Sequence, residues 1–93
     1  MLRVVLNPRA AAVLRKLAPE TQAEVVAALR QMTGAFGRPH VHGGLGLRQL
    51  RPGLYEIRAG LDLRAVLQRD GDDLIVKIIG GHSAVRDYLR NIS

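Results

Sequence analysis

The chain has 93 residues, with 14 Lys plus Arg against 8 Asp plus Glu, a formal net charge of +6 and no cysteine. This length fits one domain, residues 1–93, with one core. The lack of cysteine excludes a disulfide scaffold, a Cys-ligated zinc site and a thiol nucleophile. Apolar runs are short, so we expect neither a membrane span nor a signal peptide and predict a cytoplasmic protein. Most of the basic charge is Arg, which favours nucleic acid or an acidic protein as partner; a merely solvated basic surface is the alternative.

The first third of the chain predicts a strand followed by a helical hairpin. A β-branched run over residues 3–6 is typical of a strand and is stopped by an Asn-Pro pair. Helices are expected over residues 8–17 and 19–33, and each opens on a proline, whose missing N–H costs nothing in a first turn. Gly34 is the predicted stop of the second helix.

The rest of the chain is predicted to be mostly β-structure. After a glycine-rich loop over 34–46, strands are expected at 47–50, 54–59, 62–69 and 74–79. Ser83 is the expected N-cap of a final helix, whose apolar stripe runs from Val85 to Ile92. The order β-α-α-β-β-β-β-α predicts an α+β fold, with a mainly antiparallel sheet and helices packed on one face.

Side-chain alternation predicts a charged cluster on one face of the sheet. If the apolar residues of the second and third strands of the sheet region face the helices, Glu56, Arg58 and Arg64 share the uncovered face. Arg48 or Arg51 flanks them, depending on the register, as a further RNA-binding residue. Guanidiniums beside one carboxylate can hold a phosphate and stabilise the charge that develops on it. A polar outer face with ordinary Glu–Arg cross-strand pairs is the alternative.

Histidine and tyrosine supply the remaining candidates. His82 follows two glycines at the end of a strand, where an imidazole can act as general acid or base; an exposed loop residue is the alternative. Tyr88 lies in the apolar stripe of the last helix and is expected either in the core or with its hydroxyl at the open sheet edge. His40 and His42, in the glycine-rich loop, are expected to be incidental. Three histidines without zinc-site spacing predict no metal and no cofactor.

The segment LYEIRAGLDLRAVL, residues 54–67, resembles the toxins of the RelE/ParE superfamily. An acidic turn at 70–73, a Val/Ile-rich strand at 74–79, Gly81-His82 and a short C-terminal helix extend the similarity over nearly the whole chain. The resemblance implies a small RelE-like α+β fold. It also implies the toxin of a type II toxin–antitoxin pair.

Many members of this superfamily are ribosome-dependent endoribonucleases, and the resemblance implies that activity here. In such enzymes the ribose 2′-hydroxyl attacks the adjacent phosphate of mRNA without a metal. By position, Arg58 and Arg64 match the basic residues of the two strands. Glu56 matches a position that is Lys in some members, and a carboxylate is the general base in others. His82 matches a post-strand Arg or His, as acid or phosphate ligand, and Tyr88 matches a C-terminal Tyr.

Two other functions remain open at this point. A ParE-like toxin would inhibit DNA gyrase by protein contact through its helices, and an inactive member would only bind a partner. Leu63 and Leu67 replace aromatics common in the family and keep the inactive form open, whereas His82 with paired arginines favours the nuclease. The implied partners are the ribosome with mRNA, or gyrase in the alternative, and an antitoxin whose acidic tail orders on the basic surface.

Overall fold

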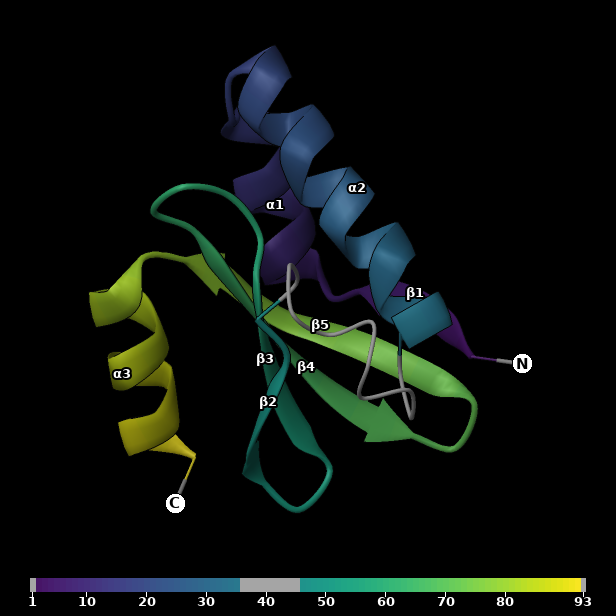
Figure 1. Ribbon diagram of the computed structural model, residues 1–93. Coiled ribbons are helices and arrows are strands. Elements are labelled where there is room, and N and C mark those ends of the chain that lie inside the picture. Colours follow the sequence, from purple (N-terminus) through teal and green to yellow (C-terminus); the bar gives the residue numbers. More distant parts are fainter. Residues whose placement is uncertain (1, 36–45, 93) are drawn as a thin grey trace.

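A computed structural model describes residues 2–35 and 46–92 and shows a five-stranded sheet with helices on both faces (Figure 1). The predicted element order and the α+β class are confirmed. None of the helices in the described ranges is long and apolar enough to cross a membrane. The elements are β1 (Arg3–Leu6), α1 (Pro8–Lys16), α2 (Pro19–Ala35), β2 (Arg48–Arg51), β3 (Leu54–Arg58), β4 (Arg64–Asp70), β5 (Asp73–Gly80) and α3 (His82–Asn91).

The sheet has the strand order β1-β5-β4-β3-β2. β2, β3, β4 and β5 pair antiparallel, and β1 lies parallel to β5. The first and last strands therefore meet, and an ion pair of 3.0 Å joins Arg3 Nε to Asp73 Oδ1. The predicted hairpin turn between β4 and β5 is confirmed, since Gly71 has the positive φ of +61° that a tight turn demands.

Local signals explain where α1 begins. The Asn7 side chain accepts a hydrogen bond of 2.8 Å from the Ala10 N–H, and Pro8 occupies the first turn. The Asn7 amide also donates to the Lys77 carbonyl over 3.1 Å, which ties the start of the helix to β5. One side chain thus serves as helix cap and as link to the sheet.

The predicted stop at Gly34 is wrong, because α2 continues to Ala35. A single glycine lowers helix propensity by only about 1 kcal/mol, which an otherwise regular helix tolerates. The remainder of the predicted loop, with His40 and His42, lies outside the described residues.

The sheet is buried on both faces, so the prediction that helices pack on one face is wrong. α1 and α2 cover the larger core, which includes Ile57, Leu67 and Val76. α3 covers a smaller cluster on the opposite face, made of Leu54, Val66, Ile78 and Val85 (Figure 1). Apolar residues at the alternate positions of β3 and β4 make this second face apolar near α3, and burying it stabilises the fold.

A bulge in β5 lets this strand serve both cores. Val66 of β4 pairs with Ile78, but the next residue, Leu67, pairs with Val76, so Lys77 is the extra residue. Val76 and Ile79 face the larger core, whereas Ile78 faces α3. The bulge therefore changes which side of the sheet each residue of β5 faces.

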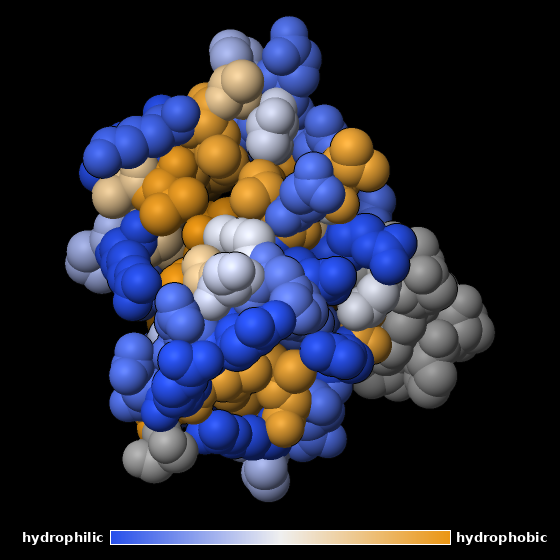
Figure 2. Space-filling view, turned by 90° about the vertical axis from the view of Figure 1, so that its left-hand side faces the viewer, coloured by the Kyte–Doolittle hydropathy of each residue, from blue (hydrophilic) through white to orange (hydrophobic). Residues whose placement is uncertain are grey.

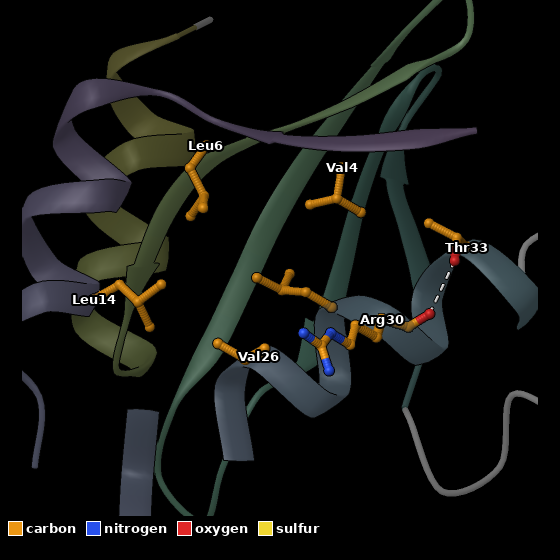
Figure 3. Close-up of a pocket in the computed structure, with 7 residues that line it drawn as sticks. Val4, Leu6, Leu14, Val26, Arg30 and Thr33 are labelled. Carbon is orange, nitrogen blue, oxygen red and sulfur yellow. Dashed lines mark hydrogen bonds between the residues drawn. The ribbon is translucent and has the colours of Figure 1, made fainter. Parts of the chain in front are cut away.

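An apolar pocket of about 340 Å³ remains between β1, α1 and α2 (Figure 3). Val4 and Leu6 point into it from β1, Leu14 from α1 and Val26 from α2. At one side the Thr33 hydroxyl donates to the Arg30 carbonyl over 2.9 Å. The helical hairpin thus leaves the β1 side of the larger core less filled than its centre.

Candidate functional site

Three of the predicted site residues meet at one end of the sheet. The register places Arg58 of β3 opposite Arg64 of β4, and Arg64 opposite Gly80 of β5. The chain then turns through Gly81 into α3, whose first residue is His82. A pocket of about 370 Å³, here called the arginine–histidine pocket, is lined by Arg58, Leu61, Asp62, Leu63, Arg64, Gly81 and His82.

Glu56 lies behind this pocket and organises its arginines. Its Oε1 is 3.0 Å from Arg48 Nε and 3.7 Å from Arg64 Nη1. The Glu56 side chain is only 3% exposed, against 64% for Arg48 and 37% for Arg64. A buried carboxylate between two guanidiniums fixes their position and balances their charge.

The prediction that Glu56 lies on an uncovered face is therefore wrong. Alternation predicted the side of the sheet that Glu56 shares with Arg58 and Arg64, but the Glu56 side chain is buried there and contacts Arg48 and Arg64. Of the two possible flanking arginines, Arg48 is the one opposite Glu56, because the β2–β3 register pairs these two residues directly.

The N-cap of α3 lies two residues before the predicted one. Gly81, not Ser83, is the N-cap, with extended φ and ψ of −80° and −174°, and its carbonyl accepts the Val85 N–H over 3.1 Å. His82 is therefore the first helical residue instead of part of a linker. The free N–H groups and positive dipole end of α3 lie beside the arginine–histidine pocket, where they favour an anion.

Gly80 sets the distance between β5 and α3. A Cβ built at this position would lie 2.7 Å from the Ala84 Cβ, closer than two carbon atoms can approach without a backbone shift. At Gly81 the nearest atom to such a Cβ is the Asp62 carbonyl oxygen, at an ordinary 3.7 Å. The absence of a side chain at Gly80 therefore lets α3 fold back on the sheet with His82 at its start.

Tyr88 and Arg51 do not line the arginine–histidine pocket. Both line a second pocket, under the C-terminal half of α3, and Arg51 Nη2 donates to the Leu89 carbonyl over 3.1 Å. Tyr88 packs partly against the smaller core, as its apolar stripe predicted. Burial raises the pKa of the Tyr88 phenol above its ordinary 10, although the Arg9 charge acts in the opposite direction.

Two charged residues at these pockets were not among the sequence-based candidates. Asp62, in the connection between β3 and β4, lines the arginine–histidine pocket and is exposed. Lys77 lines the second pocket. For Lys77, a lone lysine in an apolar strand was a usable sequence signal. The placement of Asp62 depends on the geometry of the loop between β3 and β4. Within residues 2–35 and 46–92, no group of three or more His, Cys, Asp and Glu is placed to hold a metal ion.

No protein-family model and no curated protein matches the sequence, but solved structures match the fold. The RelB-RelE antitoxin-toxin complex from Methanococcus jannaschii gives a TM-score of 0.66 at 13% identity, over 90% of this chain and 96% of that chain. The toxin-antitoxin complex RelBE2 from Mycobacterium tuberculosis gives 0.67 at 18% identity, over 87% and 98%. The YoeB-YefM complex from Staphylococcus aureus gives 0.60 at 17% identity, over 88% and 98%.

In each comparison the similarity extends over nearly the full length of this chain and of the chain that it matches. The resemblance seen in residues 54–67 is thereby confirmed at the level of the whole architecture. This chain has the RelE-like fold.

Proposed function

We propose that this chain is the toxin of a type II toxin–antitoxin pair and that it cleaves mRNA on the ribosome. The observation that carries the proposal is that Arg58, Arg64 and His82, from three different elements, line one pocket. Two cations, an imidazole and a helix N-terminus form a set suited to a phosphodiester that gains negative charge during reaction. Two of the matching structures are antitoxin-toxin complexes, which supports the same class.

The proposed reaction is attack of a ribose 2′-oxygen on the adjacent phosphorus. A base takes the 2′-hydroxyl proton, the O2′–P bond forms, the P–O5′ bond breaks, and an acid protonates the leaving 5′-oxygen. His82 as imidazolium is the proposed acid, and Arg58 and Arg64 stabilise the phosphorane. The products are a 2′,3′-cyclic phosphate and a 5′-hydroxyl end.

The base in this proposal is Asp62, because it is the exposed carboxylate on the pocket. Glu56 is buried and engaged with two guanidiniums, which supports a positioning role instead of proton transfer. Tyr88 is given no proton-transfer role, since it lines the other pocket.

The proposed protein partner is an antitoxin with an acidic segment. The chain carries a net charge of +6, and several of its arginines are exposed around α3 and β2. An acidic segment that folds on this surface would neutralise the same cations that hold RNA.

The test is induced expression in bacteria, with growth recorded and mRNA 5′ ends mapped. Wild type is expected to arrest growth and to cut translated mRNA. His82→Ala is expected to lower cleavage by about 10²–10⁴-fold, as loss of a general acid does. Arg64→Ala should cost about 10²–10³-fold, as loss of one charge-stabilising group does.

Two variants serve as controls. Ser83→Ala changes the exposed neighbour of His82, and Arg15→Ala removes an exposed arginine from the last turn of α1; both are expected to remain toxic. If folded His82→Ala and Arg64→Ala still arrest growth, the nuclease proposal is wrong. Arrest accompanied by SOS induction and loss of gyrase supercoiling would identify the ParE-like alternative.

A further inference from the structure

The second pocket, of about 570 Å³, is separate from the arginine–histidine pocket and shares no lining residue with it. Its polar lining consists of Arg51, Gln68, Lys77 and Tyr88, over an apolar floor that includes Leu54. Of the described residues that line it, none is acidic. Figure 2 looks onto the α3 side of the molecule and shows hydrophilic side chains gathered around a smaller apolar patch.

Lys77 reaches this pocket because of the bulge in β5. As the extra residue between the Val76 and Ile78 pairs, it has no partner in the ladder with β4, and its side chain lies on the side of α3. The Asn7 amide holds its carbonyl over 3.1 Å. The bulge thus places a half-buried lysine, in the middle of an apolar strand, at the lining of the second pocket.

Arg51 and Tyr88 face the same space from β2 and α3. One N–H of the Arg51 guanidinium bonds to the Leu89 carbonyl, which fixes the planar group, and a guanidinium has five donors in all. The Tyr88 phenol, whose ordinary pKa is about 10, keeps its proton at neutral pH, so its hydroxyl is a hydrogen-bond donor. Two cations and a neutral O–H donor with no carboxylate among them match the oxygens of a phosphate group.

The two pockets lie along one path. Leu54, at the floor of the second pocket, and Arg58, in the first, are four residues apart on β3, about 13 Å at the usual rise of a strand. Both pockets open on the side of the sheet that α3 covers, one at each end of that helix. A single strand of a few nucleotides can bridge this distance.

We propose that the second pocket binds a phosphate of the same single-stranded RNA whose scissile phosphodiester enters the arginine–histidine pocket. This rests on the proposed function, and it assigns Tyr88, Arg51 and Lys77 to holding the strand at a distance from the cut. Lys77 and Arg51 pair with the phosphate oxygens, and the Tyr88 hydroxyl donates a hydrogen bond to them. Contacts of this kind hold the backbone and carry no base preference.

The test measures the binding of a short 2′-O-methyl single-stranded RNA, which cannot be cut. Fluorescence anisotropy gives the affinity at several salt concentrations. Lys77→Gln is expected to weaken binding several-fold and to reduce the slope of log affinity against log salt by about 0.7, the value for one phosphate contact on a single strand. Tyr88→Phe should weaken binding without changing the slope, because a neutral donor releases no counterion. Lys77→Arg should restore both affinity and slope.

Lys16→Gln is the matched control, since Lys16 is the chain's other lysine and lies exposed at the end of α1. It should leave the slope unchanged. Equal slopes for wild type and folded Lys77→Gln would overturn the proposal, as would an equal loss in Lys16→Gln. This outcome is independent of the mRNA cleavage assay. If wild type cuts mRNA but its salt slope does not depend on Lys77, the nuclease proposal stands and the proposal for the second pocket is wrong. If the slope depends on Lys77 but mRNA is not cut, the second pocket binds RNA and the nuclease proposal is wrong.

Discussion

Glu56 is the residue on which the arrangement of cations depends most directly. One buried oxygen faces both Arg48 and Arg64, which come from the two strands on either side of β3. Without that charge, the two guanidiniums would repel each other and Arg64 would lose its fixed position beside Arg58. Under the proposed function, stability and activity are therefore coupled at this buried side chain.

Glu56→Gln is expected to lower the free energy of unfolding by about 1–3 kcal/mol, because it removes the charge from a buried, hydrogen-bonded carboxylate. Urea denaturation measures this change. Glu24→Gln, at an exposed position on α2, is the control and should stay within about 0.5 kcal/mol of wild type. A Glu56 variant as stable as the control would show that the two ion pairs contribute nothing to the fold.

Tyr88 gives the protein a pH dependence at the alkaline end. Its pKa is raised by burial, so the unfolded state loses the phenolic proton at a lower pH than the native state does. The contribution to stability is complete below pH 10, the ordinary value, and is lost as the pH rises through the raised native value. The unfolding free energy of wild type minus that of Tyr88→Phe should be constant up to about pH 9 and fall above pH 10. A constant difference up to pH 11 would contradict the raised pKa.

At the scale of elements, the junction between β5 and α3 decides where His82 lies. Gly80→Ala places a methyl group 2.7 Å from the Ala84 Cβ, so the first turn of α3 must move. Overpacking of this kind costs about 1–3 kcal/mol, measurable by thermal unfolding, and cleavage should fall with it. Gly34→Ala is the control, because a Cβ built there has no other atom within 4 Å. Equal effects of the two substitutions would exclude steric contact with Ala84 as the cause.

Most elements could be predicted from the sequence because their signals are local. Asn7-Pro8 marks the start of α1, the Asp-Gly turn joins β4 to β5, and alternation places Ile57 and Leu67 toward the helical hairpin. The bulge at Lys77 could not be predicted, since it arises from which pairs β4 and β5 form and not from either strand alone. The same applies to the start of α3 at Gly81.

The grouping of the candidate site residues could be predicted only where it depends on local signals. Alternation and order in the chain were sufficient to group Arg58 and Arg64, and the short turn after β5 brought His82 beside them. Glu56, which contacts the side chains of Arg48 and Arg64, is buried on a face that was expected to be open. Tyr88 and Arg51 were separated from His82 by the length of α3, a distance that appears only when the helix is laid on the sheet.

At the scale of the whole molecule, two cores of unequal size hold the sheet. Among residues 2–35 and 46–92, four buried residues make up the cluster between α3 and the sheet, against twelve in the core beneath α1 and α2. The smaller cluster should open at a lower free energy than the rest of the domain, and opening it removes His82 from the arginines.

Native-state hydrogen exchange tests this difference. Amides of α3 are expected to exchange through openings that cost less than global unfolding, whereas those of β4 and β5 follow the global value. Val85→Ala should speed exchange in α3 by about 10-fold or more, because removing buried methyl groups costs about 0.8 kcal/mol each. Uniform protection across α3 and the central strands would contradict the two-core description.

The parallel pairing of β1 with β5 has a consequence for biosynthesis. β1 can pair with β5 only after Asp73, the partner of Arg3, has been synthesised 70 residues later. Such a distant contact forms late, because the intervening loop must first be ordered. His82 lies beyond even that strand, so the arginines of the arginine–histidine pocket leave the ribosome before the histidine does. Under the proposed function, the nascent protein would thus stay harmless to the ribosome that is making it.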